Sequence, residues 1–162
     1  MKDRAIIFVY GEGGHKAQMN RLLQLIQPEC MSGFEYLGIC ENDNSLPRLK
    51  TNYSFPPLRD KYSHLKSVYR FPFSFYLYLK LLIKLHLNYN IQAVVSTGPG
   101  IAVVVSVFCK LLRKKVVYIE TWSRFETRSH TGWIMYKLAD RFYIQNKSLQ
   151  KYYPNAIYSG LL

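Results

Sequence analysis

A short apolar run, a glycine-rich loop and a helix-like segment follow one another twice in this chain, and this pattern limits the possible folds more than any other feature. The first copy comprises the run 5–10, the loop 11–15 and the segment 16–27, whose apolar residues recur at helical spacing. The second copy comprises the run 91–96, the loop 97–100 and an apolar segment behind it. Short apolar, β-branched runs predict strands, and glycines end them. Each copy therefore predicts a strand, a loop and a helix.

Similar signals continue along the rest of the chain. Further strands are predicted at residues 34–40, 53–55, 115–120, 141–145 and 156–158, and further helices at 74–88, 100–112 and 131–138. Strands that alternate with helices and are apolar nearly throughout indicate a parallel sheet with helices on both faces. The predicted fold class is therefore α/β and Rossmann-like, with ligands at the carboxyl ends of the strands. A length of 162 residues predicts one domain, 1–162.

The amino-acid composition limits the kinds of molecule that the chain is expected to bind. Hydrophobic residues make up 49% of the chain and aromatic residues 15%, which excludes disorder caused by low hydrophobicity. A formal net charge of +12 predicts attraction to an anionic partner, such as nucleic acid, lipid headgroups or a phosphorylated substrate. No acidic residue lies between Asp60 and Glu120, so the positive charge is concentrated in the middle third. Because no nucleic-acid recognition motif is present, nucleic acid is not an expected partner.

The cysteines and the apolar runs indicate the cellular compartment in which the chain works. Cys30, Cys40 and Cys109 are odd in number and widely spaced, which favours neither a disulfide framework nor a zinc site and fits a reducing cytosol. We expect no metal and no cofactor bound by this chain. The N-terminal apolar run ends in a glycine loop, as in a first strand and not a signal peptide. No apolar run approaches the roughly 20 residues of a membrane-spanning helix, so no span is expected.

The predicted helix 74–88 is a candidate membrane-contact segment. It is apolar and aromatic except for a stripe that carries Lys80 and Lys84. Such a helix can lie in a membrane interface, with lysines at headgroup level and aromatic residues such as Phe75 and Tyr78 just below. The alternative is a buried helix with one solvated basic edge. The absence of acidic residues around it favours the membrane.

The two glycine loops are the candidate ligand site. Glycines let the backbone approach a ligand closely, and a helix N-terminus offers N–H groups to an anion, so the loops 11–15 and 97–100 could hold a diphosphate between them. The alternative for each loop is a tight turn without a ligand. Lys16 stands where a dinucleotide fingerprint requires a third glycine, and the Lys-Ser/Thr of a P-loop is missing. His15 could be a base, a phosphate donor or a capped surface residue.

Glu120 is the candidate carboxylate. It closes a predicted strand, in Tyr118-Ile119-Glu120-Thr121-Trp122-Ser123-Arg124, and so could face the crevice at the strand ends. A salt bridge to Arg124 or a helix-capping role is the alternative.

Six motifs occur in an order that resembles a known family. They are GEGGH, STGPG, YIETWSR, SHTG, LADRFYIQ and YSGLL. Over residues 6–162 the chain resembles the acceptor-binding subunit of the two-subunit UDP-GlcNAc transferase of the dolichol pathway. It is more similar still to bacterial PssD-type proteins of exopolysaccharide and capsule synthesis. The resemblance implies the N-terminal half of a GT-B glycosyltransferase, similar to the enzyme that adds GlcNAc to lipid I in peptidoglycan synthesis.

The resemblance also implies roles for particular residues. The acceptor is a polyprenyl-diphosphate-linked saccharide, whose diphosphate faces the glycine loops, and His15 and Glu120 are the catalytic residues. The diphosphate-binding residues are Gly11, Gly13, Gly14, Thr97, Gly98 and Gly100. Glu12 stands where the family more often has a small residue, and its carboxylate would repel a diphosphate unless it turns away or is paired.

The implied assembly has two parts. A separate donor-binding subunit carries the UDP-sugar and docks at Gly160, Leu161 and Leu162, and the chain transfers sugar only in that complex. The resemblance implies that the chain is a peripheral membrane protein at the cytoplasmic face of the plasma membrane. The eukaryotic subunit begins with a membrane anchor, whereas this sequence begins at the first strand. The alternative function is a non-catalytic membrane scaffold that recruits and activates the transferase subunit.

Overall fold

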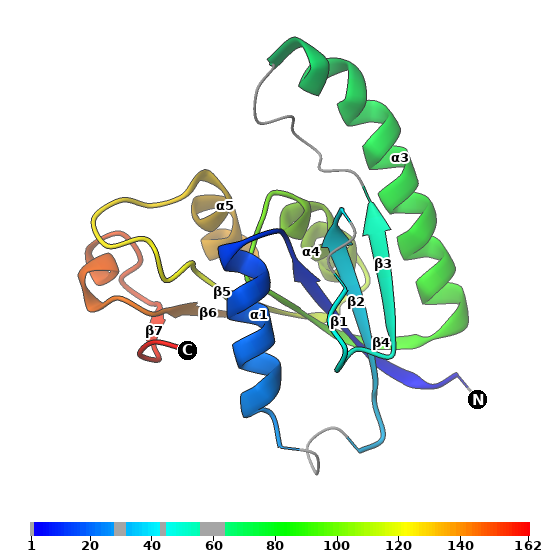
Figure 1. The fold of residues 1–162 in the computed structure, drawn as a ribbon, viewed down its shortest axis with the longest axis horizontal. Coiled ribbons are helices and arrows are strands. Elements are labelled where there is room, and N and C mark those ends of the chain that lie inside the picture. Colours follow the sequence, from blue (N-terminus) through cyan, green and yellow to red (C-terminus); the bar gives the residue numbers. More distant parts are fainter. Residues whose placement is uncertain (1, 28–31, 43–44, 56–63) are drawn as a thin grey trace.

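The computed structural model describes residues 2–27, 32–42, 45–55 and 64–162, and within them the predicted alternation of strands and helices is confirmed (Figure 1). The elements are β1 (Arg4–Tyr10), α1 (Gly14–Leu25), β2 (Glu35–Glu41), β3 (Thr51–Phe55), α3 (His64–Asn88), β4 (Asn90–Ser96), α4 (Ile101–Leu111), β5 (Lys115–Ile119), α5 (His130–Leu138), β6 (Arg141–Ile144), the 3₁₀ helix η1 (Lys147–Lys151) and β7 (Ile157–Tyr158). All strands pair in parallel in the order β3-β2-β1-β4-β5-β6-β7.

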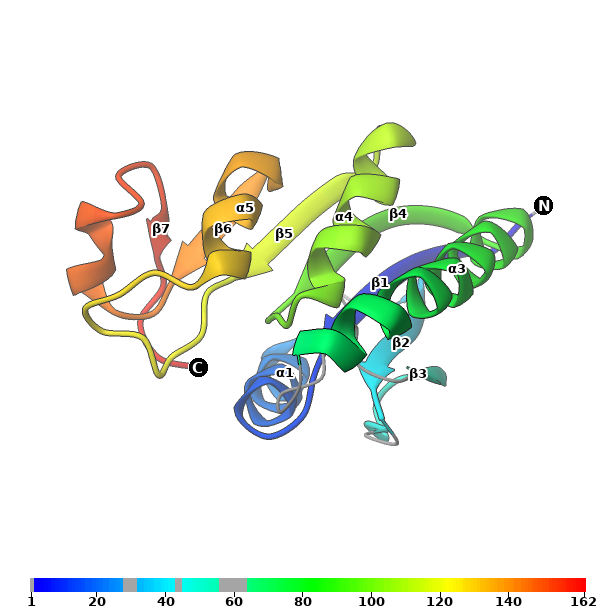
Figure 2. The ribbon, with the colours of Figure 1, turned by 90° about the horizontal axis from the view of Figure 1, so that it is seen from above.

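The helices lie on both faces of this sheet, as predicted. Figure 2 shows α3, α4 and α5 on one face and α1 on the other. The chain moves outward from β1 to β3, crosses to β4 and then proceeds in the opposite direction to β7. Because crossover connections between parallel strands are right-handed, reversing the direction moves the helices to the opposite face. The carboxyl ends of β1 and β4 are adjacent at the point of reversal, where ligands of such folds bind.

Alternate residues of the central strands supply two cores. Ile7 and Val9 of β1 point into the larger core, under α3, α4 and α5, whereas Phe8 and Tyr10 point into the smaller core that α1 covers. All four side chains are buried. Burial on both faces explains why the central strands have nearly continuous apolar sequences.

The predicted start of the helix at residue 74 is wrong, since α3 begins at His64 and contains Pro72. Proline usually ends a helix, but it removes only one backbone hydrogen bond. Buried Ser74, Leu82 and Leu85 hold α3 against its neighbours. None of the helices in the described ranges has the length and apolarity that crossing a membrane requires.

Tyr78 corrects the membrane-contact prediction. Its side chain is fully buried, and its ring lies 4.9 Å from that of Phe55, centroid to centroid. It therefore belongs to the core, whereas Phe75, Lys80 and Lys84 on the same helix are exposed.

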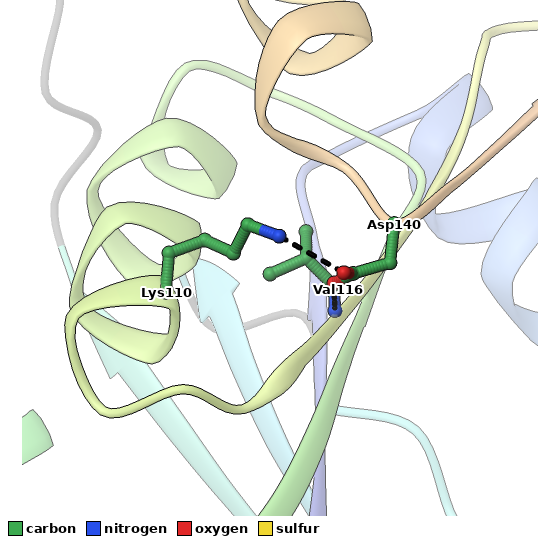
Figure 3. A network of polar contacts seen from close by, with 3 residues as sticks. All are labelled: Lys110, Val116 and Asp140. Atoms are coloured by element: carbon green, nitrogen blue, oxygen red, sulfur yellow. Dashed lines mark hydrogen bonds and ion pairs between the residues drawn. The ribbon is translucent and has the colours of Figure 1, made fainter.

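A polar clamp fixes α4 to the strands beside it (Figure 3). The Asp140 carboxylate accepts hydrogen bonds from Lys110 Nζ at 2.9 Å and from the Val116 N–H at 2.8 Å. Partial burial acts to raise the pKa of Asp140, but these two hydrogen bonds and the charges of Lys110 and Lys115 together outweigh it and lower the pKa. The clamp ties the end of α4 to the starts of β5 and β6.

Candidate functional site

The two glycine loops meet at the carboxyl ends of β1 and β4. Thr97 joins them through three hydrogen bonds: its N–H donates to Val9 O at 3.2 Å, its Oγ1 donates to His15 O at 3.1 Å, and its carbonyl accepts from His15 Nδ1 at 2.5 Å. Thr97 is fully buried. Its predicted direct contact with a diphosphate is therefore corrected: the side chain holds the loops together and does not face the crevice.

Two of the glycines are needed for this contact between loops. A Cβ on Gly98 would lie 2.7 Å from Cε1 of His15, and Gly98 has a φ of +96° that side chains rarely adopt. A Cβ on Gly11 would lie 2.8 Å from Cδ of Pro99. Gly11 is buried and packs against Pro99, and its contact with a diphosphate stays a prediction.

The other glycines leave two helix N-termini open. Gly13 and Gly100 precede α1 and α4 without a side-chain cap, and within the described residues a Cβ on either would meet no atom within 4 Å. Gly14 is exposed as well. The first N–H groups of α1 lack partners within their own helix and carry partial positive charge, which suits an anion. At the start of α4 the N–H groups of Ala102 and Val103 already donate to Pro99 O and Gly100 O, at 2.9 and 3.1 Å.

His15 lies in the first turn of α1 and lines the space between the loops. Because a carbonyl oxygen only accepts, the contact with Thr97 O assigns the ring proton to Nδ1. In the neutral ring Nε2 then carries the lone pair. This tautomer suits a base that takes a proton at Nε2.

A cavity of about 210 Å³ lies beside His15. Besides His15, it is lined by Gly98, Pro99, Tyr118, Glu120, Thr121, Ser123, Arg124, Ser129 and Thr131. Hydroxyl groups and one guanidinium thus surround the imidazole. Arg124, which the sequence suggested only as a salt-bridge partner, is the cation of this lining, and its Nη1 donates to Thr127 Oγ1 at 2.9 Å.

The Glu120 side chain is fully buried at one wall of this cavity. Its carboxylate accepts hydrogen bonds from Ser129 Oγ at 3.0 Å and from the Tyr153 hydroxyl at 3.3 Å. Ser129 caps α5 by accepting from the Gly132 N–H at 2.7 Å. Burial raises the pKa of Glu120, and the hydrogen bonds from Ser129, the Thr121 N–H and Tyr153 oppose the shift. Glu120 thereby supports the cap of α5, which agrees with the helix-capping alternative.

Two buried glutamines that the sequence analysis missed bind the main chain at Glu120. Gln18 of α1 and Gln145 after β6 donate through Nε2 to Glu120 O, at 3.2 and 2.9 Å. Gln145 Oε1 also accepts from the Leu162 N–H at 3.0 Å. Side chains from α1 and from the end of β6 therefore fix the crevice wall, and one of them reaches the C-terminal residue.

The segment between β5 and α5 is held from outside by the connection between β6 and β7. Asn146 Nδ2 donates to Trp122 O at 2.8 Å, Ser148 Oγ donates to Phe125 O, and the Tyr152 hydroxyl donates to Glu126 O at 2.5 Å. Sequence patterns did not predict η1, so these contacts were missed too. The motif LADRFYIQ, which ends just before Asn146, was the available signal.

Glu12 turns toward the end of β2, where Asn42 Nδ2 donates to its carboxylate. A hydrogen-bond donor thus partly offsets its charge, as a nearby anionic ligand would require.

The C-terminal residues lie apart from the glycine loops. Leu161 is 70% exposed, and Gly160 has a φ of +74°. An apolar cavity of about 350 Å³ lies next to them, between α1 and the strands β2, β1, β4, β5 and β6. Its lining includes Leu22, Ile26, Val117, Tyr143 and Leu162.

Comparison with known proteins extends the resemblance. The family profile described as "Oligosaccharide biosynthesis protein Alg14 like" matches residues 6–162. The "UDP-N-acetylglucosamine transferase subunit ALG14" of Kluyveromyces lactis is 26% identical over 189 residues, covering 100% of this chain and 80% of the relative. The mouse protein of the same name is 29% identical over 180 residues, covering 96% and 81%.

Solved structures support the fold. MurG of Acinetobacter baumannii superposes with a TM-score of 0.56 at 13% identity, over 88% of this chain and 41% of MurG. A UDP-N-acetylglucosamine 2-epimerase gives a TM-score of 0.61 at 10% identity, over 93% and 44%. The chain thus spans less than half the length of these GT-B enzymes, which is consistent with the predicted half of such a fold. Since the family profile covers nearly the whole chain, this protein belongs to the Alg14-like family of oligosaccharide biosynthesis proteins.

Proposed function

We propose that this chain binds the acceptor of a glycosyl transfer, a polyprenyl-diphosphate-linked saccharide, in the crevice beside His15. One observation supports this most: His15 in the first turn of α1, Pro99 just before α4 and the Arg124 side chain line a single crevice. N–H groups and a guanidinium are suited to phosphate oxygens, and the imidazole is suited to a reacting hydroxyl.

In this proposal a separate subunit brings the UDP-sugar over the strand ends. The acceptor hydroxyl oxygen attacks the anomeric carbon, the bond from that carbon to the UDP oxygen breaks, and UDP leaves. The hydroxyl proton passes to His15 Nε2, whose partner Thr97 keeps the ring in the required tautomer. Glu120 acts as a positioning residue through Ser129 and the start of α5.

The proposed docking element for the subunit is the C-terminal tail, Gly160, Leu161 and Leu162. Exposed Leu161 lies near exposed Ile157 and Tyr158 of β7, and β7 is the last strand of the sheet. The adjoining apolar cavity offers further surface to a partner. Gln145 links Leu162 to the main chain of Glu120, so the docked tail would adjoin the crevice wall.

The identity of the acceptor saccharide and the membrane at which transfer takes place are also part of the proposal. Extension of a bacterial exopolysaccharide or capsule precursor at the cytoplasmic face of the plasma membrane rests on the motif resemblance. The names of the relatives make UDP-GlcNAc the first donor to test. A non-catalytic scaffold for the partner subunit is the competing function, and the His15 tautomer favours the enzyme subunit.

Acceptor binding tests the proposal directly. Titration of the purified chain with a short-chain, water-soluble polyprenyl diphosphate carrying one GlcNAc should give saturable binding. Arg124→Gln should weaken it by about 10-fold or more, because a charge-assisted hydrogen bond is lost. Arg128→Gln is the matched control, since Arg128 lies in the same loop but does not line the crevice.

Equal affinities for the two arginine variants, or no binding by the wild-type chain, would place the acceptor elsewhere.

A further inference from the structure

We propose that the outer surface of α3 and α4 is a docking surface for an anionic lipid bilayer. The surface consists of the exposed apolar residues and exposed lysines of these two adjacent helices. They are Phe73, Phe75, Tyr76, Leu79, Lys80, Ile83, Lys84 and Leu87 of α3, and Val107 and Leu111 of α4.

The exposed apolar residues of α3 recur at helical spacing and therefore form one face of the helix. Tyr76 is 58% exposed, Ile83 46% and Leu87 62%, and successive turns of one helix bring these residues to a common face. The opposite face of α3, with Tyr78 and Leu82, is fully buried in the core. The helix is therefore apolar on both sides, one covered by the sheet and the other open. Large apolar surface left open on a folded protein marks an interaction site.

Charge identifies the occupant as a membrane surface. The sequence from residue 61 to residue 119 contains no acidic side chain, and α3 has none in its first turn. Exposed Lys80 and Lys84 lie among the apolar residues of the open face. This combination of apolar groups and cations, without anions, matches an interface with apolar chains below and anionic headgroups above.

The position of α3 relates this surface to the crevice. The helix runs antiparallel to the strands, and its 25 residues span about 37 Å, whereas a strand of 7 residues spans about 23 Å. Figure 1 shows the start of α3 lying beyond the arrowheads of β2 and β3. Phe73, Phe75 and Tyr76 thus lie toward the edge of the sheet that carries the glycine loops. A docked bilayer would lie close to the crevice; this consequence rests on the proposed function, whereas docking itself does not.

Flotation with lipid vesicles tests the docking without any transfer reaction. The full chain should float with vesicles of phosphatidylcholine containing phosphatidylglycerol, and less at high salt. Lys80→Glu with Lys84→Glu should lower the partition coefficient by about 30-fold or more, since each lysine contributes roughly a factor of five. Lys147→Glu with Lys151→Glu makes the same change in net charge on exposed residues of η1, far from α3 in Figure 1, and should leave most of the binding intact.

Replacing exposed apolar residues by serine tests whether apolar side chains enter the bilayer or whether charge alone accounts for the binding. Tyr76→Ser with Ile83→Ser should also abolish flotation, whereas Leu25→Ser with Phe125→Ser, at positions elsewhere that are at least as exposed, should not. Circular dichroism and thermal melting establish that each variant is folded. If the test and control pairs lost flotation equally, the effect would be due to net charge or to general hydrophobicity, and the proposal would be overturned. Self-association through this face in place of vesicle binding, measured by light scattering, would overturn it as well.

Discussion

Among the described glycines, Gly132 is the one at which the surrounding atoms leave the least room for a side chain. A Cβ there would lie 1.7 Å from Oε2 of Glu120 and 2.7 Å from the Tyr153 hydroxyl. Gly132→Ala must displace a buried carboxylate and should lower the free energy of unfolding by about 3 kcal/mol or more. Gly100→Ala is the control, because a Cβ there meets nothing within 4 Å in the part of the chain that the structure describes, and φ is −54°. Equal denaturant midpoints for the two variants would contradict the assigned contact.

His15 is the residue that distinguishes an enzyme subunit from a scaffold. His15→Ala should lower the turnover of the reconstituted complex by about 100-fold, because a general base is removed. His15→Gln keeps a donor at the outer end of the side chain but no base, so it should be equally impaired. Partner affinity and melting temperature serve as controls. Near wild-type turnover in His15→Gln would identify the side chain as a phosphate donor, and near wild-type turnover in His15→Ala would favour the scaffold.

The roles of single residues were harder to predict than their presence. The sequence singled out Glu120 because it follows a strand, but its partners Ser129 and Tyr153 lie 9 and 33 residues further along the chain, and only the fold brings all three together. Gln18 and Gln145 are unremarkable residues in sequence and become informative only through their shared acceptor, Glu120 O.

At the scale of elements, the strands were predictable because their two-sided burial leaves a nearly continuous apolar run, as in β4. The start of α3 was missed because Pro72 resembles a helix end. Tyr78 was misplaced for a different reason. Helical periodicity sorts residues into faces but does not state which apolar face meets the sheet, and α3 is apolar on both.

The clamp between α4 and β5 gives an element-scale prediction of pH dependence. The lowered pKa of Asp140 means that its contribution to stability is present above the unfolded pKa, about 3.9, and is lost as the pH falls through the lower folded value. Asp140→Asn should lower the free energy of unfolding at pH 7 by about 0.5–1 kcal/mol, a small effect because both side chains are partly exposed.

A double-mutant cycle with Lys110→Met, measured by urea unfolding at pH 7 and pH 3, isolates this pair. The coupling should be present at pH 7 and weaker at pH 3. A coupling that is the same at both pH values would show that the ion pair is not its source.

At the scale of the whole molecule, the sheet gathers the chemistry at one edge. The reversal of strand order beside β1 and β4 places both glycine loops, His15 and the end of β5 at that edge, with the C-terminal tail on β7. The sequence predicted this gathering, because strands of a parallel sheet end at one edge. It did not predict the apolar cavity beside Leu162, since the cavity depends on how α1 and the tail pack over the sheet from β2 to β6.

The central claim is that this chain supplies the acceptor half of a transferase whose donor half is a separate subunit. The most direct measurement is transfer of radiolabelled sugar from UDP-GlcNAc and other UDP-sugars to a membrane lipid extract, with the purified chain alone, the partner alone and both together. We predict transfer only when both are present, and loss of complex formation without unfolding when residues 160–162 are deleted. Robust transfer by the purified chain alone would contradict the claim, as would the absence of transfer with both subunits and a competent lipid extract.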